Sequence, residues 1–287
     1  MTTTSQAQLK IIETPRDGMQ GIGQFIPIHK KIEFINLLLQ CGFDTVEVGS
    51  FVSPKAIPQM KDTAEVLGKI DLSDTNSKIA VLVVNEKGGE KAVQYDFVDQ
   101  LFFPFSISPT FIQRNLNTTI EKAEKTIDKL QDLCVRTGKT LVTYLSMGFG
   151  DPYGDEWNLE LLRFWVEKLR DKGITTIPLS DIMGDVTPER ITEVFTFLGN
   201  NFPDVEFGLH LHTLAGQERA KIDAAWQAGI RRYDTVINGL GGCPMAGKEL
   251  ISNLPLAQLT AYCHEKNIAT GLNKTFVEMA RNYPLLK

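Results

Sequence analysis

The sequence predicts an α/β protein folded as a (β/α)8 TIM barrel with extra C-terminal helices. Three observations support this fold: eight short apolar runs, amphipathic stretches between them, and glycines where those stretches end. Near-continuous Val, Ile and Leu runs are typical of parallel strands that are covered on both faces. An open, doubly wound sheet would show the same alternation, but no GxGxxG follows the first run, which disfavours a dinucleotide-binding fold.

The predicted strands recur from one end of the chain to the other. Each is a short run rich in β-branched and aromatic residues, bounded by polar or glycine-containing segments. The eight ranges are Leu9–Glu13, Thr45–Val48, Ile79–Val84, Phe97–Phe103, Thr140–Ser146, Thr176–Leu179, Glu206–His212 and Tyr233–Asn238.

Helices are predicted between the strands from apolar residues that recur at helical spacing. The clearest are His29–Gln40, Thr118–Arg136, Leu159–Asp171, Pro188–Leu198 and Gly216–Ala228. Glycines that follow helices are predicted to be left-handed: Gly42, Gly138, Gly173 and Gly229. The chain after Gly239 predicts a further helix pair that caps the barrel. We expect residues 1–287 to form one catalytic domain, because barrels of ~250 residues fold as single domains.

Composition indicates an ordinary globular protein of the cytoplasm. Hydrophobic residues make up 43% and charged residues 23%, and the net charge of −5 argues against nucleic acid or an anionic membrane as a partner. The first six residues are polar, and no segment reaches the ~18 apolar residues of a membrane span. The four cysteines are far apart without CxxC spacing, which disfavours a zinc cluster and fits a reducing compartment.

The most informative motif is a pair of histidines in Gly208-Leu209-His210-Leu211-His212, at the end of the seventh predicted strand. Residues i and i+2 of a strand lie on one face, so both imidazoles can point to one place at the carboxyl end of the strand. Two converging imidazoles indicate a metal site. The alternative is a packed, hydrogen-bonded pair without a ligand.

Other polar residues fall where a barrel keeps its catalytic groups, at the carboxyl ends of strands. Arg16 and Asp17 follow the first strand, Glu47 ends the second, and Asp181 follows the sixth. A single acid at a strand end is more often a helix cap or a salt-bridge partner, so neither Glu47 nor Asp181 is decisive alone.

Asp17 and the two histidines would offer oxygen and nitrogen ligands, with room for substrate oxygens. Mg²⁺ or Mn²⁺ suits such a set, and Zn²⁺ is a further candidate. Arg16 would then place a guanidinium near a developing oxyanion; its alternative role is an ion pair at the rim of the barrel.

A glycine-rich loop follows the last strand, with the sequence Gly239-Leu240-Gly241-Gly242-Cys243-Pro244. Its glycines predict a mobile loop, and Cys243 on that loop would be a reactive thiol. A tight turn with an incidental cysteine is the alternative. Asn253 is either the N-cap of a helix over Leu254–His264 or a metal ligand.

These motifs resemble those of the 3-hydroxy-3-methylglutaryl-CoA (HMG-CoA) lyase family of metal-dependent TIM-barrel enzymes. The resemblance spans nearly the whole chain. Arg-Asp-Gly at 16–18 and His-x-His at 210–212 also occur in a wider superfamily of metallolyases and Claisen-condensing synthases. The lyase branch is indicated by Ser-Phe-Val-Ser-Pro-Lys at 50–55 and by Gly-Gly-Cys-Pro at 241–244.

The resemblance implies a role for each matching residue. The implied metal ligands are Asp17, His210, His212 and Asn253. The implied catalytic residues are Arg16 as electrostatic catalyst and Cys243 as proton-transfer group, supported by Glu47 and by the ligands Asp17 and His210. The implied substrate-binding residues are Gln20, Ser50, Ser53, Lys55 and Asp181.

The implied reaction is the retro-Claisen cleavage of (S)-3-hydroxy-3-methylglutaryl-CoA to acetyl-CoA and acetoacetate, as in leucine catabolism and ketone body metabolism. The resemblance also implies a divalent metal cofactor, an acyl-CoA thioester as partner and a homodimer.

Three departures leave the substrate less defined than the reaction class. Thr213 stands where the family commonly has Asp, the segment between Cys243 and Asn253 is one residue longer, and Ala257 replaces a common glutamate. The alternatives are a lyase for a 3-hydroxy-3-alkylglutaryl-CoA with a longer branch, a Claisen-condensing acyl-CoA synthase, and a non-catalytic acyl-CoA binder.

Overall fold

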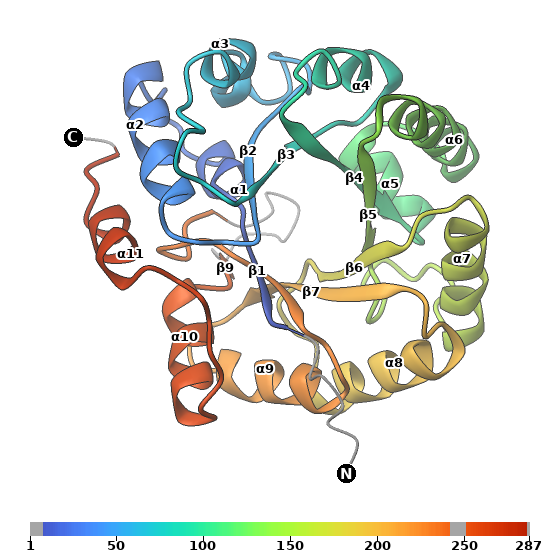
Figure 1. Cartoon of the computed structure of the whole chain (residues 1–287). Coiled ribbons are helices and arrows are strands. Elements are labelled where there is room, and N and C mark those ends of the chain that lie inside the picture. Colours follow the sequence, from blue (N-terminus) through green and yellow to red (C-terminus); the bar gives the residue numbers. More distant parts are fainter. Residues whose placement is uncertain (1–7, 242–250, 286–287) are drawn as a thin grey trace.

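The computed structural model describes residues 8–241 and 251–285 and confirms the predicted barrel (Figure 1). Parallel strands surround the central axis and helices form an outer ring around them. The strands of the barrel are β1 (Lys10–Glu13), β2 (Thr45–Ser50), β3 (Lys78–Leu82), β4 (Val98–Ser106), β5 (Thr140–Ser146), β6 (Thr176–Asp181), β7 (Glu206–Thr213) and β8 (Arg232–Thr235).

Strands that are consecutive in the chain are neighbours in the sheet, and β8 pairs with β1 to close it. In the closing pair Ile12 lies opposite Asp234 and Glu13 lies opposite Thr235. Because all eight strands are parallel, their carboxyl ends share one rim. The short strand β9 (Ser252–Asn253) pairs antiparallel with the end of β7 at this rim.

The helices predicted between the strands are present near their predicted bounds: α2 (Ile28–Leu39), α6 (Ile120–Thr137), α7 (Leu159–Asp171), α8 (Pro188–Asn201) and α9 (Glu218–Gln227). The side chains of Thr119, Asn158 and Thr187 cap α6, α7 and α8 by accepting hydrogen bonds from backbone N–H groups. The glycines that were predicted to be left-handed all have positive φ angles, which confirms the prediction for Gly42, Gly138, Gly173 and Gly229.

The sequence prediction missed the shorter helical segments, which span too few residues for a repeating apolar pattern. They are α1 (Pro15–Gln20), the 3₁₀ helix η1 (Pro58–Met60), α3 (Thr63–Leu67), α4 (Glu86–Ala92) and α5 (Pro109–Leu116). None of the described helices is both long and apolar enough to cross a bilayer.

The predicted C-terminal helix pair is present as α10 (Leu256–Glu265) and α11 (Lys274–Arg281). It does not cap the barrel, so that part of the prediction is wrong. Helix α10 packs against α9 and α11 packs against α2, and the pair thereby completes the outer ring (Figure 1).

Several strand ends differ from prediction, and those of β2, β6 and β8 affect the site. β6 continues to Asp181, which therefore ends this strand rather than following it. β2 continues to Ser50, so Glu47 lies inside the strand rather than at its end. β8 ends at Thr235, before the predicted Asn238, because the next residue, Val236, donates its N–H to the carbonyl of Leu254.

Glu13 connects the first strand of the barrel to the segment after the last. Its carboxylate is fully buried and accepts hydrogen bonds from the N–H of Ile237 (2.7 Å) and the hydroxyl of Thr235 (2.9 Å). Burial raises the pKa of Glu13 to about 8, although both hydrogen bonds favour the charged form.

Glu13 should make folding stability depend on pH. Its pKa is higher in the folded protein than in the unfolded chain, so its stabilising contribution is complete below about pH 4.5 and is lost as the pH rises towards 8. We expect Glu13→Gln to remove a slope of up to ~1.4 kcal/mol per pH unit. Urea unfolding of both proteins from pH 5 to pH 8.5 measures this difference.

The control for Glu13→Gln is Glu160→Gln, which changes an exposed carboxyl on α7 and should preserve the wild-type slope. Equal slopes in wild type and Glu13→Gln would show that Glu13 does not hold a proton in the folded state.

Candidate active site

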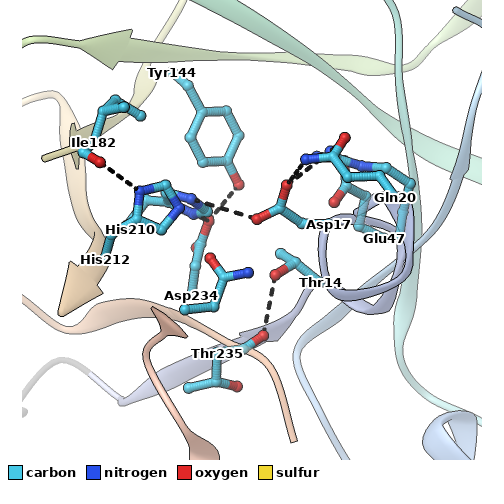
Figure 2. Close-up of polar contacts among 12 residues, drawn as sticks. Thr14, Asp17, Gln20, Glu47, Tyr144, Ile182, His210, His212, Asp234 and Thr235 are labelled. Atoms are coloured by element: carbon cyan, nitrogen blue, oxygen red, sulfur yellow. Dashed lines mark hydrogen bonds and ion pairs between the residues drawn. The ribbon is translucent and has the colours of Figure 1, made fainter. Parts of the chain in front are cut away.

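Three candidate metal ligands meet at the carboxyl rim of the barrel. His210 and His212 lie on β7, and Asp17 lies on α1 just after β1 (Figure 2). One ligand atom of each residue lies within 4.8 Å of the others. Alternation along β7 brings the two imidazoles to one side, and closure of the barrel brings Asp17 to them.

Each imidazole is held through its Nδ1 atom. Nδ1 of His212 lies 3.2 Å from the carbonyl oxygen of Ile182, and Nδ1 of His210 lies 3.1 Å from Oδ2 of Asp234 (Figure 2). The Nε2 atom of His210 faces Oδ2 of Asp17 at 3.9 Å. Because Nδ1 of each ring is engaged in this way, Nε2 is the ring atom of each histidine that is left for the cluster.

The unpaired polar atoms of this cluster fit a bound cation. Oδ2 of Asp17, Nε2 of His212 and Oδ1 of Asn253 are buried and have no hydrogen-bond partner among the described residues. Leaving buried polar atoms unpaired is costly, and a divalent ion would satisfy these atoms together. Two imidazole nitrogens with carboxylate and amide oxygens suit Mg²⁺, Mn²⁺ or Zn²⁺.

Asn253 reaches the cluster from β9, where it lies opposite His212. Its amide N–H donates to the carbonyl of Leu240 at 3.0 Å, which leaves Oδ1 free for a ligand. Helix α10 begins at Leu256 with Pro255 as its N-cap, so the interpretation of Asn253 as an N-cap is wrong.

The electrostatic surroundings keep Asp17 ionised and His212 neutral. Burial opposes the charge of Asp17, but the Arg16 guanidinium and the two imidazoles outweigh burial and lower the pKa of Asp17. Burial, followed by the neighbouring His210, lowers the pKa of His212 to about 4. A carboxylate and a neutral imidazole are the forms that bind a metal.

Arg16 is held rigidly beside the cluster. Its Nε and Nη2 atoms donate to Oε1 of Glu47 at 3.0 and 2.7 Å, and its Nη1 atom donates to Asp17 (3.0 Å) and Gln20 (2.9 Å). Burial raises the pKa of Glu47 to about 7, although Arg16 favours its charged form. These hydrogen bonds hold the guanidinium in one orientation beside the cluster.

These groups line a cavity of about 540 Å³ at the barrel mouth. One part of its wall is polar and includes Arg16, Asp17, Gln20 and both histidines. The other part is apolar and consists of Val52, Ile57, Leu82, Val84, Pro104, Phe111, Leu116 and Ile182. Arg114, Asn115 and Asn117, from α5 and the residue after it, also line the cavity.

The other predicted substrate-binding residues are divided between this cavity and other places. Ser53 lines the cavity, whereas Lys55 is exposed in the turn that follows β2. Ser50 is buried and lines a separate cavity of about 320 Å³ between α3 and α4. The carboxylate of Asp181 accepts hydrogen bonds from the backbone N–H groups of Gly184 (3.0 Å) and Val186 (3.3 Å) in the loop after β6.

Cys243 lies outside the described residues, so its predicted catalytic role stays a prediction. The loop that leads to it packs tightly against α1. A Cβ atom on Gly241 would lie 2.7 Å from the carbonyl oxygen of Asp17, and Gly241 has a φ of +84°. Only glycine fits there without strain. The absence of a side chain lets the start of the loop lie directly against Asp17.

Sequence reasoning missed Tyr144 and Asp234. The hydroxyl of Tyr144, on β5, donates to Oδ2 of Asp234, on β8, at 2.6 Å, and both side chains are buried (Figure 2). Both residues lie within strands, whereas the polar residues that the sequence singles out lie at strand ends and in the loops that follow them. In the structure Asp234 lies opposite Ile12, whose side chain faces the barrel interior. Alternation along the predicted eighth strand was the one available sequence signal for such an inward-facing position.

Comparisons with known proteins identify the family of this chain. A sequence model of the HMGL-like family matches residues 8–282. Mitochondrial hydroxymethylglutaryl-CoA lyase of Mus musculus is 31% identical over 94% of this chain and 82% of its own length. Hydroxymethylglutaryl-CoA lyase of Bacillus subtilis is 32% identical over 81% of this chain and 77% of its own length.

Solved structures show the same relationship. An HMG-CoA lyase of Acinetobacter baumannii, solved in complex with coenzyme A and 3-methylmalate, is 28% identical with a TM-score of 0.88, covering 98% of this chain and 91% of its own. The HMG-CoA lyase of Bacillus subtilis has a TM-score of 0.90 at 28% identity, covering 96% and 92%. The chain therefore belongs to the HMGL-like family, whose HMG-CoA lyase members are carbon–carbon lyases.

Proposed function

We propose that this protein cleaves (S)-3-hydroxy-3-methylglutaryl-CoA to acetyl-CoA and acetoacetate. The observation that carries the proposal is the convergence of Asp17, His210 and His212 beside the buried guanidinium of Arg16. Family membership supports the reaction class, and the combined polar and apolar walls of the cavity suit a branched acyl thioester.

The proposed cofactor is Mg²⁺ or Mn²⁺, with Zn²⁺ as the further candidate. Asp17 Oδ2, His210 Nε2, His212 Nε2 and Asn253 Oδ1 are the atoms that would hold it. A divalent ion there supplies Lewis-acid polarisation of a substrate hydroxyl and an acyl oxygen.

The proposed chemistry follows from the charge that each stage develops. The tertiary hydroxyl would give its proton to a base in the cavity, so that its oxygen forms the ketone of acetoacetate while the adjacent C–C bond breaks. That base would later return the proton to the group that protonates the enolate. The electron pair of that bond passes to the acetyl-CoA fragment, which leaves as an enolate. Arg16 would stabilise the enolate oxygen, and Glu47 would keep the guanidinium in place.

The enolate carbon finally takes a proton, and we propose Cys243 as the donor. The thiols of Cys41 and Cys134 are buried, and burial raises the pKa of each to about 12. Those two are poor acids, whereas the loop that carries Cys243 begins against Asp17.

A panel of thioesters tests the proposed function. The purified protein should release acetyl-CoA and acetoacetate from the methyl compound faster than it cleaves analogues with longer C3 branches. Preference for a longer branch would redefine the substrate. Free thiol from acetyl-CoA and a 2-oxo acid would indicate a synthase, and tight binding without turnover would indicate a non-catalytic protein.

Metal removal should abolish activity, and Mg²⁺ or Mn²⁺ should restore it. We expect His212→Ala to weaken Mn²⁺ binding by at least tenfold, because it removes one ligand atom of the cluster. Equilibrium dialysis measures the affinity without substrate. His264→Ala, which changes an exposed histidine on α10, is the control. Wild-type affinity in His212→Ala would contradict the proposed metal site.

Arg16→Gln should lower kcat by ~10²-fold or more with a smaller change in KM, because the guanidinium acts on charge that develops in the transition state. Steady-state kinetics measure both constants, with Arg163→Gln on the exposed face of α7 as the control. Thermal unfolding confirms folding, since Glu47 loses its buried partner. An increase confined to KM would make Arg16 a binding residue.

Cys243→Ser should lower kcat by ~10²- to 10⁴-fold, because a hydroxyl is a far weaker acid than a thiol of similar size. The matched controls are Cys41→Ser and Cys134→Ser, whose buried side chains should affect stability more than chemistry. A kcat for Cys243→Ser within about threefold of wild type would reduce this cysteine to a turn residue.

A further inference from the structure

We propose that Asp234 is a positioning residue that fixes the tautomer and ring orientation of His210, so that the Nε2 lone pair points at the metal site. This inference rests on the proposed function in one respect, the presence of a metal at the cluster. It assigns a role to Asp234, which lies behind the cluster.

The contact itself supports the assignment. Oδ2 of Asp234 lies 3.1 Å from Nδ1 of His210, and the side chains are 1% and 13% exposed. An ionised carboxylate can only accept hydrogen bonds, so this contact requires the hydrogen of a neutral His210 to be on Nδ1. The Nε2 atom is then left with its lone pair, and it faces Oδ2 of Asp17 at 3.9 Å.

A second hydrogen bond holds Asp234 in place. The hydroxyl of Tyr144 donates to the same Oδ2 atom at 2.6 Å, and the Tyr144 ring lies edge-on to His210 at 5.6 Å. A hydroxyl that donates its only proton to Asp234 favours the acceptor state of that oxygen. The buried guanidinium of Arg232, two residues earlier on β8, interacts favourably with the negative charge of Asp234.

The two histidines are oriented by different means. His212 has the backbone carbonyl of Ile182 as its partner, and no side-chain substitution removes that group. His210 depends on the side chain of Asp234. Substitution of Asp234 should therefore affect one imidazole and leave the other in place. Loss of such a partner behind a ligating histidine typically weakens metal affinity by roughly 10- to 100-fold.

The first test reads the tautomer directly in the metal-free protein. The chain has only four histidines, so ¹⁵N-histidine labelling gives a simple long-range ¹H–¹⁵N spectrum, and His210→Gln identifies the His210 signals. At a pH where the ring is neutral, we expect hydrogen on Nδ1 in wild type and a mixture of tautomers in Asp234→Ala. Hydrogen on Nε2 of wild-type His210 would overturn the proposal, whatever the variants do.

The second test measures Mn²⁺ affinity by equilibrium dialysis without substrate. Asp234→Ala should weaken binding by roughly 10- to 100-fold, and Asp234→Asn, which keeps an oxygen acceptor of the same size, should recover part of that loss. Tyr233→Phe is the matched control, because the Tyr233 hydroxyl lies on the far side of β8, 3.4 Å from the carbonyl oxygens of Ile222 and Ile230 that can accept its one proton.

The affinities of two variants distinguish failure of the positioning role from failure of the metal site. Wild-type affinity in folded Asp234→Ala, together with weakened binding in His210→Ala, would overturn the positioning role and leave the metal site standing. Wild-type affinity in both variants would overturn the metal site itself, and with it the proposed function.

Discussion

The pairing of β8 with β1 closes the sheet, and the candidate site depends on that closure. Asp17 follows β1, Asp234 lies on β8 and the two histidines lie on β7. In an open sheet β1 and β8 would be separate edges, and the carboxylate could not meet the imidazoles. Glu13 reinforces the closure, because it is on β1 and accepts hydrogen bonds from residues on and after β8.

Closure also concentrates charged side chains in a buried part of the barrel mouth. Asp17, Glu47 and Asp234 are all buried, and Arg16 is the direct partner of the first two. Buried ion pairs contribute little net stability, but removal of one partner typically costs about 3–5 kcal/mol. These ion pairs therefore fix the positions of the charged side chains more than they stabilise the fold. The unpaired atoms of Asp17, His212 and Asn253 leave a further imbalance that a divalent cation would relieve.

The parts of the fold that sequence predicted are those with a repeated physical pattern. The strands and long helices repeat their apolar spacing, and alternation along β7 was sufficient to pair His210 with His212. Short α1 has no such repeat, although Pro15 at its first position is a helix-start signal that could have been used. The sequence predicts the C-terminal helix pair but not its position, because an apolar helix face does not indicate which neighbour it packs against.

In the site, too, sequence patterns predict some residues and not others. The motif at 50–55 implies that Ser50 binds substrate, yet Ser50 lines the separate cavity between α3 and α4. The register of β2 against β3 shifts between Glu47 and Gly49, so alternation along the sequence does not predict which face Ser50 occupies. Asp234 faces inwards, but an isolated acid within a strand gives no local signal of the tyrosine and histidine that it contacts. Its partners are 90 and 24 residues away in the chain, and only the closed barrel brings them together.

The central claim is that the residues at this rim form one divalent metal site. Anomalous diffraction from crystals grown with Mn²⁺ tests the claim most directly, because the signal locates manganese independently of any assay. We expect one strong peak within ligand distance of Asp17, His210, His212 and Asn253, at about 2.0–2.3 Å from each donor atom. A fully ordered rim without a peak, or a peak bound by other residues, would contradict the account.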